Sequence, residues 1–326
     1  MPARRRLGAA ITVVTILALV GTTPGAATTD RGPHHAASAP QVVVGRHHEL
    51  FFGLEFDYYC QLDASIGRAM GRLSRLARLI ERSGRTVIFT VAPNKSLVMP
   101  DQVRWAELPH HRCDRRGMAE QRQLLDDYDD DRFLSLRSAL ASDDRQIYWK
   151  TDHHWTSVAG TVLAKSLAER LDPALKPHLR YRPTTLTMLG VLNAMRGRWV
   201  EETAEAAVPS GRVRVRTAPG STEWDGMPDV VFDHSWVSRP ARLTWPGHTL
   251  VVGDSFGIHV LENLRPLFRR GRFMWINHTG TTDVVEAIRD AQTVVLEVYQ
   301  TGAGQSVMAL HPFYRAVQEA LRHDLR

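Results

Sequence analysis

Cysteine is scarce in this sequence, whose 326 residues contain two, Cys60 and Cys113. Neither cysteine has a neighbouring residue in the sequence that would ionise its thiol, so we do not expect a catalytic cysteine. Both lie in the part that we expect to be exported, where an even pair of cysteines favours a disulfide over two free thiols. The sequence therefore predicts a Cys60–Cys113 disulfide that joins the entry segment to the loop after the first strand of the sheet.

A strong excess of one charge is also absent. The chain has 41 Lys and Arg residues against 35 Asp and Glu, a formal charge of +6. Three of the basic residues lie in the expected export signal, so 38 basic against 35 acidic residues leave +3 for the mature chain. The basic residues are nearly all arginine and are scattered among acids, as on an ordinary solvated surface. This pattern excludes a nucleic-acid-binding footprint.

Long apolar runs are missing as well. The uncharged, largely apolar run from Leu7 to Val20 is short for a membrane span. It follows the basic residues Arg4–Arg6 and precedes the small residues Gly25–Ala27, which is the pattern of a secretory signal peptide. We therefore expect a signal peptide over residues 1–27, and an extracellular, periplasmic or envelope-associated protein; an uncleaved anchor is the alternative.

The rest of the chain reads as a linker and one domain without internal repeats. Residues 28–41 are rich in Ala, Thr, Ser and Pro and lack periodicity, which predicts a disordered linker. Residues 42–326 alternate between helical and strand patterns, so we expect one α/β domain with a mainly parallel sheet flanked by helices. Residues 180–246 are turn-rich and predict a mixed insertion beside the active site. The other expected elements are helices at 66–80, 118–125, 133–140, 186–195, 283–289 and 312–325, a helix after Thr156, and strands at 86–92, 147–149, 273–276 and 293–298.

The sequence around Ser255 predicts a strand, a tight turn and a helix. Thr249–Val252 is a buried-strand run that leads directly into Gly253-Asp254-Ser255, and Phe256–Arg270 has helical spacing. In such a turn Ser255 stands at the carboxyl end of a strand, with N–H groups of the helix start available to an oxyanion. Ser255 is therefore a candidate nucleophile. The alternative is that Asp254 or Ser255 only caps the helix.

The two side chains that a serine nucleophile needs occur earlier in the chain. A hydroxyl attacks efficiently when an imidazole takes its proton and a carboxylate orients that imidazole. Asp152 and His154 are candidates, because residues two apart in an extended segment share a side, and Thr156 then caps a helix. Asp-x-His is also a common metal arrangement, but no other ligand cluster of suitable spacing accompanies it, so we expect no metal and no other cofactor.

These motifs carry a resemblance to a known family. Asp152-His153-His154-Trp155 and Gly253-Asp254-Ser255-Phe256 resemble the Asp-x-His-Trp and Gly-x-Ser-Phe motifs of the alginate O-acetyltransferase family of exported, SGNH-like proteins, the AlgX/AlgJ type. The segments 42–52 and 87–100 are similar to that family as well. The Asp/His block precedes the serine, as in that family, whereas ordinary GDSL esterases have the serine block first. The resemblance implies an SGNH-hydrolase-like (flavodoxin-like) fold and His154, not His153, as the base.

The resemblance also implies a function. It implies acetyl transfer through Ser255 to hydroxyls of an exported or cell-surface polysaccharide, with the donor presented by a membrane-bound acyltransferase. A carbohydrate esterase or deacetylase would use the same residues, and a non-catalytic scaffold of a polysaccharide export complex is a further alternative. We expect no carbohydrate-binding module after the core, unlike some AlgX-type members, so the insertion is the expected substitute.

Polar residues follow several predicted strands. The carboxyl ends of parallel strands meet at one edge of a sheet, so such residues are candidates for binding substrate or an oxyanion, although each could instead cap a strand or turn. The candidates are Asn94, Lys95, Trp155, Asp254, Asn277 and Tyr299. His259, His110 and His111 are expected to be solvated.

Overall fold

The structure, a computed structural model, describes residues 39–60, 66–217, 222–224 and 227–325. The expected signal peptide and most of the expected linker lie outside these residues. The first strand of the described chain, β1, begins at Val42. None of the helices in the described part combines the length and the hydropathy that a membrane-spanning segment needs.

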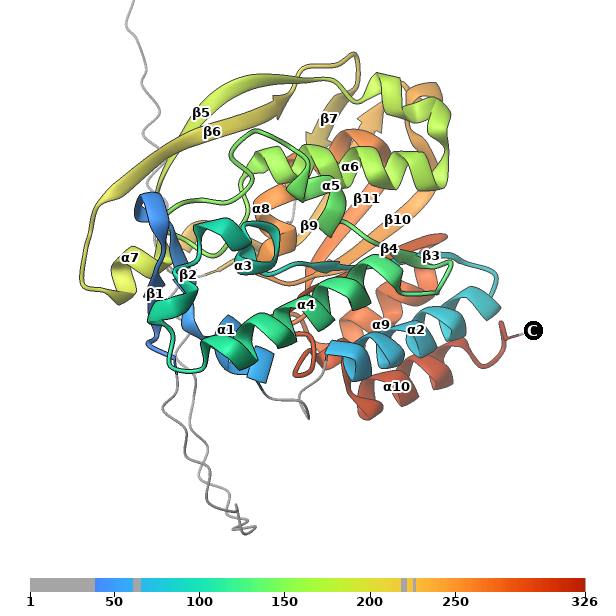
Figure 1. The fold of residues 1–326 in the computed structure, drawn as a ribbon. Coiled ribbons are helices and arrows are strands. Elements are labelled where there is room, and N and C mark those ends of the chain that lie inside the picture. Colours follow the sequence, from blue (N-terminus) through green and yellow to red (C-terminus); the bar gives the residue numbers. More distant parts are fainter. Residues whose placement is uncertain (1–38, 61–65, 218–221, 225–226, 326) are drawn as a thin grey trace, which may run out of the picture.

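An eight-stranded sheet forms the centre of the molecule (Figure 1). Its order is β4-β3-β12-β10-β11-β9-β7, with β8 paired to β9. The first five strands of this order are parallel, and β9 pairs with β11 in the antiparallel sense. The strands are β3 (Thr86–Ala92), β4 (Phe133–Leu134), β7 (Arg214–Thr217), β8 (Thr222–Trp224), β9 (Met227–Arg239), β10 (Trp245–Gly253), β11 (Phe268–Trp275) and β12 (Thr293–Tyr299).

Helices cover both faces of this sheet (Figure 1). On one side lie α2 (Ile66–Arg82), α9 (Thr281–Asp290) and α10 (His311–Leu321), and on the other α6 (Ser157–Leu171) and α8 (Ser255–Leu264). Successive residues of a strand point to opposite faces, so Leu250 and Val252 of β10 join the first core while Val251 joins the second. Burial on both faces explains why the central strands of the sheet are largely apolar. The predicted α/β fold with a mainly parallel sheet is confirmed.

The N-terminal segment packs at one end of the sheet. Strands β1 (Val42–Val44) and β2 (Leu50–Phe52) form an antiparallel ribbon that leads into α1 (Gly53–Cys60). The predicted disulfide between Cys60 and Cys113 is present, and it joins α1 to α4 (His111–Asp127). Cys113 thus lies in a helix and not in a loop. The short helices α3 (Lys95–Val98) and α5 (Arg137–Ala141) complete this part.

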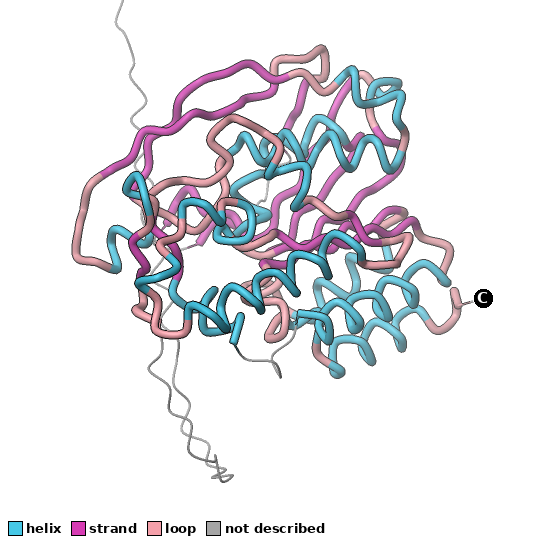
Figure 2. The backbone as a smooth tube through the Cα atoms, in the orientation of Figure 1, coloured by secondary structure: helices cyan, strands magenta, loops and turns pink. Residues whose placement is uncertain are grey.

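The segment predicted as an insertion has two different parts. Strands β5 (Tyr181–Leu189) and β6 (Glu201–Pro209) form a separate antiparallel ribbon, and α7 (Val191–Met195) lies at its tip. Figure 2 shows the two strands side by side along the outside of the molecule. The second part, β7 to β9, extends the central sheet. The helix predicted from Leu186 therefore begins at Val191, because pairing with β6 keeps the chain extended as far as Leu189.

Three further local predictions were wrong. Residues 133–140, predicted as one helix, contain strand β4 and then helix α5. Backbone pairing with β3 keeps Phe133 extended although the spacing of the apolar residues is helical. Residues 147–149 form no regular strand, only a single bridge between Tyr148 and Trp155. Helix α8 ends at Leu264, since Pro266 lacks the N–H that a continuing helix needs, and β11 begins at Phe268.

Candidate active site

The residues around Ser255 form a tight turn between β10 and α8, which we call the nucleophile turn (residues 253–257). Asp254 caps α8, because its Oδ1 accepts a hydrogen bond from the Phe256 N–H at 2.9 Å. Its Oδ2 accepts from the Tyr299 N–H at 2.6 Å, which ties the turn to the neighbouring strand β12. Asp254 itself donates its N–H to Glu297 Oε2 at 3.2 Å. The sheet thus fixes the backbone on which Ser255 stands.

The residues around His154 form a closed loop before α6, which we call the base loop (residues 148–156). Its two ends are joined by hydrogen bonds from Trp149 N–H to His154 O at 3.2 Å and from Thr156 N–H to Ile147 O at 2.7 Å. Thr156 also caps α6, as predicted, by accepting from the Val158 N–H. The base loop therefore ends in a helix start, as the nucleophile turn does.

The two segments bring three side chains together. His154 Nε2 lies 2.8 Å from Ser255 Oγ, and His154 Nδ1 lies 2.8 Å from Asp152 Oδ1. Because an ionised carboxylate only accepts, Nδ1 carries the proton and Nε2 is left to accept from the serine hydroxyl. This is the geometry of a serine nucleophile, a base and an orienting carboxylate, which we call the triad.

The Asp152 carboxylate is strongly held as an anion. Burial alone would raise its pKa, but the adjacent His154 imidazole and the hydrogen bonds from His154 and Val191 hold the pKa well below its usual range. Its Oδ2 accepts from the Val191 N–H at 2.7 Å, and its Oδ1 accepts from the His154 N–H at 3.0 Å. The N–H of Val191 comes from α7, so the tip of the β5–β6 ribbon supports the triad.

Packing between α6 and α8 sets the distance between base and nucleophile. A Cβ at Gly160 of α6 would lie 2.7 Å from Asn263 Oδ1 of α8, so the Asn263 side chain packs where a side chain at 160 would begin. Trp155 is fully buried and donates its Nε1–H to Phe256 O at 2.7 Å. Trp155, predicted as a substrate or oxyanion residue, therefore joins the base loop to the nucleophile turn from inside the protein.

Lys95 lies behind the base loop. Its side chain is 0% exposed and pairs with Glu49 at 2.8 Å. Its Nζ also lies within hydrogen-bonding distance of the carbonyl oxygens of Leu50 (2.9 Å), Trp149 (2.6 Å) and Lys150 (3.1 Å). Burial lowers the pKa of Lys95, and the charge of Glu49 opposes that shift. Lys95 was predicted to contact substrate, but the structure places it where it holds the base loop.

Asn94 and Tyr299 belong to a buried polar network. Tyr299 donates its hydroxyl to Glu55 Oε1 at 3.2 Å, and its ring stacks on Phe256 with centroids 4.3 Å apart. Asn94 is 1% exposed and accepts from the Thr301 hydroxyl at 2.8 Å. Burial raises the pKa of the Glu55 carboxyl at the centre of this network. Both predicted residues are therefore held inside the protein by this network, and Tyr299 also contacts the nucleophile turn.

The oxyanion donors are the part of the site that stays a prediction. The N–H of Ser255 is at the first position of α8 and has no partner within the described chain, so it is free to bind an oxyanion. Asp254 offers only acceptors there and acts as a helix cap. Asn277 is exposed just after β11, where the Ile276 N–H donates to Gly253 O at 2.9 Å. Asn277 thus remains a candidate second donor.

Sequence reasoning missed Glu297. This residue is 1% exposed in the middle of β12, and its Oε1 has no hydrogen-bond partner. Burial and the nearby charge of Asp254 raise its pKa well above the usual value, which favours the neutral form of the carboxyl. A lone Glu within the apolar run 293–299 was the signal that could have identified it.

Sequence reasoning also misplaced one histidine. His259 was expected to be solvated, but its ring stacks on His154 with centroids 4.4 Å apart. It follows Ser255 by four residues on α8, a spacing that puts both on one helix face and could have revealed it. The ring of His153 lies 4.1 Å from that of His154 and stacks on Phe52. Burial and the charge of His154 lower the pKa of both His153 and His259 to about 3, so both are neutral.

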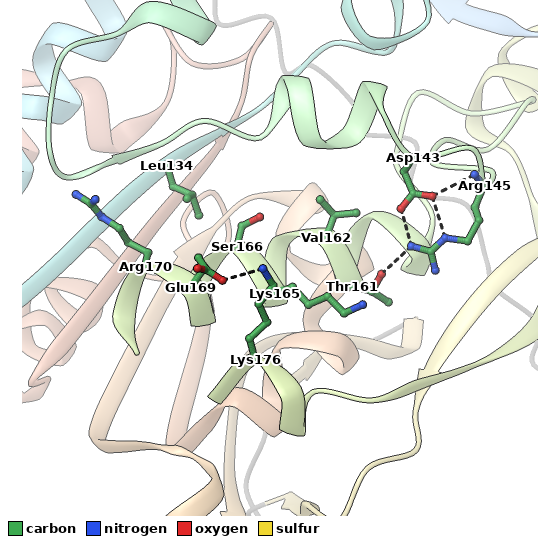
Figure 3. A pocket seen from close by; sticks show the side chains of 10 residues that line it. All are labelled: Leu134, Asp143, Arg145, Thr161, Val162, Lys165, Ser166, Glu169, Arg170 and Lys176. Carbon is green, nitrogen blue, oxygen red and sulfur yellow. Dashed lines mark hydrogen bonds and ion pairs between the residues drawn. The ribbon is translucent and has the colours of Figure 1, made fainter. Parts of the chain in front are cut away.

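Two other features of the structure do not compete with the triad. Asp152, His153 and His154 offer possible metal ligands within 4.8 Å of one another, but both ring nitrogens of His154 already have protein partners. A cavity of about 490 Å³ lies against α6 and is lined by none of the triad residues. Figure 3 shows that its polar walls carry two ion pairs, Asp143–Arg145 and Glu169–Lys176.

Comparison with solved structures shows the fold. The chain resembles PatB1 of Bacillus cereus (TM-score 0.52, 13% identity, covering 75% of this chain and 92% of that one). It also resembles AlgX of Pseudomonas aeruginosa (TM-score 0.51, 15% identity, 86% of this chain and 65% of that one). A third neighbour is a DHHW family protein from Eubacterium siraeum (TM-score 0.50, 14% identity, 79% and 89%). The letters DHHW are those of residues 152–155 in this chain.

Comparison by sequence shows the family. No curated protein matches the chain. The family model described as an SGNH hydrolase-like domain, acetyltransferase AlgX, matches residues 42–209. That range contains the base loop and ends before the nucleophile turn. Since the match spans more than half of the sequence, the chain belongs to the AlgX family of SGNH hydrolase-like acetyltransferase domains.

Proposed function

We propose that this protein moves acetyl groups onto hydroxyls of an exported or cell-surface polysaccharide through an acetyl ester of Ser255. The observation that carries the proposal is the unbroken chain of two 2.8 Å contacts from Ser255 Oγ through His154 to Asp152. Membership of the AlgX family supports acetyl as the transferred group. Export is supported by the signal-like residues 1–27 and by the disulfide.

The first half-reaction loads the serine. Ser255 Oγ attacks the acetyl carbonyl of the donor as its proton passes to His154 Nε2. The negative charge that develops on the carbonyl oxygen is stabilised by the Ser255 N–H at the start of α8. The intermediate collapses to acetyl-Ser255, and the proton on His154 leaves with the donor's leaving group. Asp152 stabilises the imidazolium throughout, because its carboxylate is kept ionised.

The second half-reaction passes the acetyl group on. A sugar hydroxyl gives its proton to His154 Nε2 and attacks the acetyl carbonyl of the ester. Collapse of the intermediate releases the acetylated sugar and returns the proton to Ser255 Oγ. Water would complete the same cycle as a hydrolysis, so transfer requires that the acceptor be held at the site. We propose that a membrane-bound acyltransferase presents the donor, as the resemblance to the AlgX/AlgJ-type family implies.

Replacing Ser255 with Ala tests the proposal. Turnover of a chromogenic acetyl ester should fall by about a thousandfold or more, because the nucleophile is lost. The matched control is Ser142→Ala, which removes an exposed hydroxyl that bonds only to the Ala139 carbonyl. Mass spectrometry of the Ser255 peptide after exposure to the donor should show one added acetyl group in the parent and none in Ser255→Ala.

The other outcomes separate the alternatives. Turnover retained by Ser255→Ala would refute the assignment. Ester hydrolysis without acetylated oligosaccharide above the uncatalysed level would indicate an esterase. PatB1 has been solved with a sulfonyl adduct, so a sulfonyl fluoride is a suitable probe of the nucleophile. A chain whose Ser255 resists that probe, yet which binds glycan, would be a scaffold.

A further inference from the structure

The loop between α7 and β6 exposes a large aromatic ring. We call residues 196–200 (Arg-Gly-Arg-Trp-Val) the tryptophan loop. Trp199 is 68% exposed and Val200 is 62% exposed, the two highest values among the exposed large hydrophobic residues of the described chain. Exposing so much apolar surface is unfavourable, and such exposure on a folded protein commonly marks a binding surface. Other described tryptophans, such as Trp155 and Trp236, are buried.

The tryptophan loop is ordered by its own hydrogen bonds. Gly197 has a left-handed φ of +71°, which closes α7 in a conformation that favours glycine. The Arg198 N–H then donates to Asn193 O at 2.9 Å, and pairing of Leu189 with Glu201 closes the ribbon on the other side. The ring of Trp199 is therefore presented by a fixed backbone, which lowers the entropy lost when a ligand binds.

The tryptophan loop is also attached to the triad. Asn193, which accepts from Arg198, donates its own N–H to Thr151 O at 3.2 Å. Glu202, two residues after the loop, accepts from the Thr151 N–H at 2.8 Å and its hydroxyl at 2.7 Å. The Val191 N–H reaches the Asp152 carboxylate. A ligand held by the tryptophan loop thus lies beside the base loop, as the acceptor of a transfer reaction must.

The side chains of the tryptophan loop indicate the kind of ligand. An indole ring offers a flat apolar face with an N–H at its edge, which suits the apolar face of a sugar ring with its hydroxyls. Arg196 and Arg198 form no ion pair within the described chain, although Glu201 follows closely in sequence. Free guanidinium groups bind carboxylate, sulfate or phosphate through paired hydrogen bonds. A glycan with acidic groups matches both features.

We propose that the tryptophan loop is a subsite for the acceptor, and that the acceptor there is an acidic glycan. Trp199 stacks on a sugar ring, and Arg196 and Arg198 bind its acidic groups. This inference rests on the proposed function, because only a transferase has an acceptor. Glycan binding by the loop can nevertheless be measured without turnover. A lipid surface would also attract Trp and Arg, yet attachment of this loop to Thr151 and Asp152 favours a ligand that reaches the triad.

Binding should be measured with the full mature chain carrying Ser255→Ala. Because this variant lacks the proposed nucleophile, the binding result does not depend on whether the catalytic proposal is correct. The probes are oligogalacturonate for carboxylates, dextran sulfate for sulfates and a maltooligosaccharide as the neutral glycan. We expect an acidic glycan to bind more tightly than the neutral one, and the difference to shrink at high salt. Equal binding of acidic and neutral glycans would overturn the acidic assignment.

Substitutions then locate the subsite. Trp199→Ala should weaken binding of the acidic glycan about tenfold, as for a central aromatic contact, and Trp199→Phe should retain most of it. Arg196→Gln with Arg198→Gln should weaken it by about fivefold to tenfold and reduce the salt dependence. The matched control, Arg112→Gln with Arg115→Gln, removes the same charge from α4 and should bind like the parent.

Two outcomes would refute the subsite. One is unchanged binding of the acidic glycan by Trp199→Ala when circular dichroism shows an intact fold. The other is binding of the parent, but not of Trp199→Ala, to vesicles of phosphatidylglycerol together with no glycan binding, which would make the loop a membrane contact.

Discussion

Ser255 is held by the central sheet, whereas Asp152 and His154 are held by groups from several distant segments. The nucleophile turn follows β10 directly, and its backbone is bonded to Glu297 and Tyr299 of the adjacent strand. These are contacts between neighbours in a parallel sheet whose pairing is continuous from Thr249 to Val252. A turn built this way keeps its shape as long as the sheet is intact.

The base loop has no strand of its own. It contains one isolated bridge, and its position depends on Lys95 from one side and on Val191 of α7 from the other. Trp155 adds a bond to Phe256. The comparison indicates that activity is more sensitive to the remote supports of the base than to supports of the nucleophile. Three substitutions test this difference.

Lys95→Met should have the largest effect. It leaves the Glu49 carboxylate buried without its partner and frees the carbonyl oxygens of the base loop, so the free energy of unfolding should fall by about 3–5 kcal/mol. Chromogenic ester turnover should be nearly lost, because His154 is no longer positioned. The control is Lys176→Met, whose partner Glu169 is exposed and whose change in stability should be below about 1 kcal/mol. Equal melting temperatures for the two variants would contradict the role of Lys95.

Val191→Pro should have an intermediate effect. Proline removes the N–H that reaches Asp152 Oδ2, yet it is well tolerated at the first position of a helix, and Gly190 before it already has the extended backbone that precedes proline. A hydrogen bond to a charged group contributes about 1.5–3 kcal/mol, so kcat should fall by about tenfold to a hundredfold. Val191→Ala keeps the N–H and serves as the control. A Val191→Pro variant with the kcat of Val191→Ala would show that α7 does not support the triad.

Glu297→Gln should have the smallest effect on turnover, within about threefold, because the amide oxygen can still accept from the Asp254 N–H. Its effect on stability depends on pH. The folded-state pKa of Glu297 is raised above 4.5, so the stability it gives is present below pH 4.5 and is lost as the pH rises towards the folded-state pKa. The variant, which has no such titration, should gain stability relative to the parent over that range, by at most about 1.4 kcal/mol per pH unit. The melting temperatures of the parent and of Glu297→Gln, measured from pH 4 to 8 in steps of about one pH unit, would test this. A difference between the two proteins that does not change with pH would mean that the carboxyl ionises normally.

The same comparison explains what could be predicted from sequence. The nucleophile turn was predictable because its signal is local: an apolar run, then Gly253-Asp254-Ser255, then helical spacing. The residues of the base loop were also identified, but their supports were not. Lys95 is 57 residues from Asp152 along the chain and Val191 is 39, and no periodicity relates such positions.

Elements were misassigned where tertiary pairing decides the backbone. Strand β4 has two residues, too few to show alternation, and it exists because β3 offers it a partner. Strand β9 extends the sheet from a turn-rich region that predicted an insertion. Asn94 and Lys95 do follow a strand, as expected, and Tyr299 is the last residue of β12. Whether such residues face substrate or the interior depends on the helices packed over them.

Gly160 has a consequence that reaches beyond its own helix. It allows α6, which begins shortly after His154, to approach α8, which carries Ser255, and the Asn263 side chain fills the space opposite. We expect a methyl group at this position to separate α6 from α8 and so to move the His154 imidazole away from the Ser255 hydroxyl. Every reacting group would remain chemically intact. Reactivity in this protein is therefore adjustable from a position that no substrate ever meets.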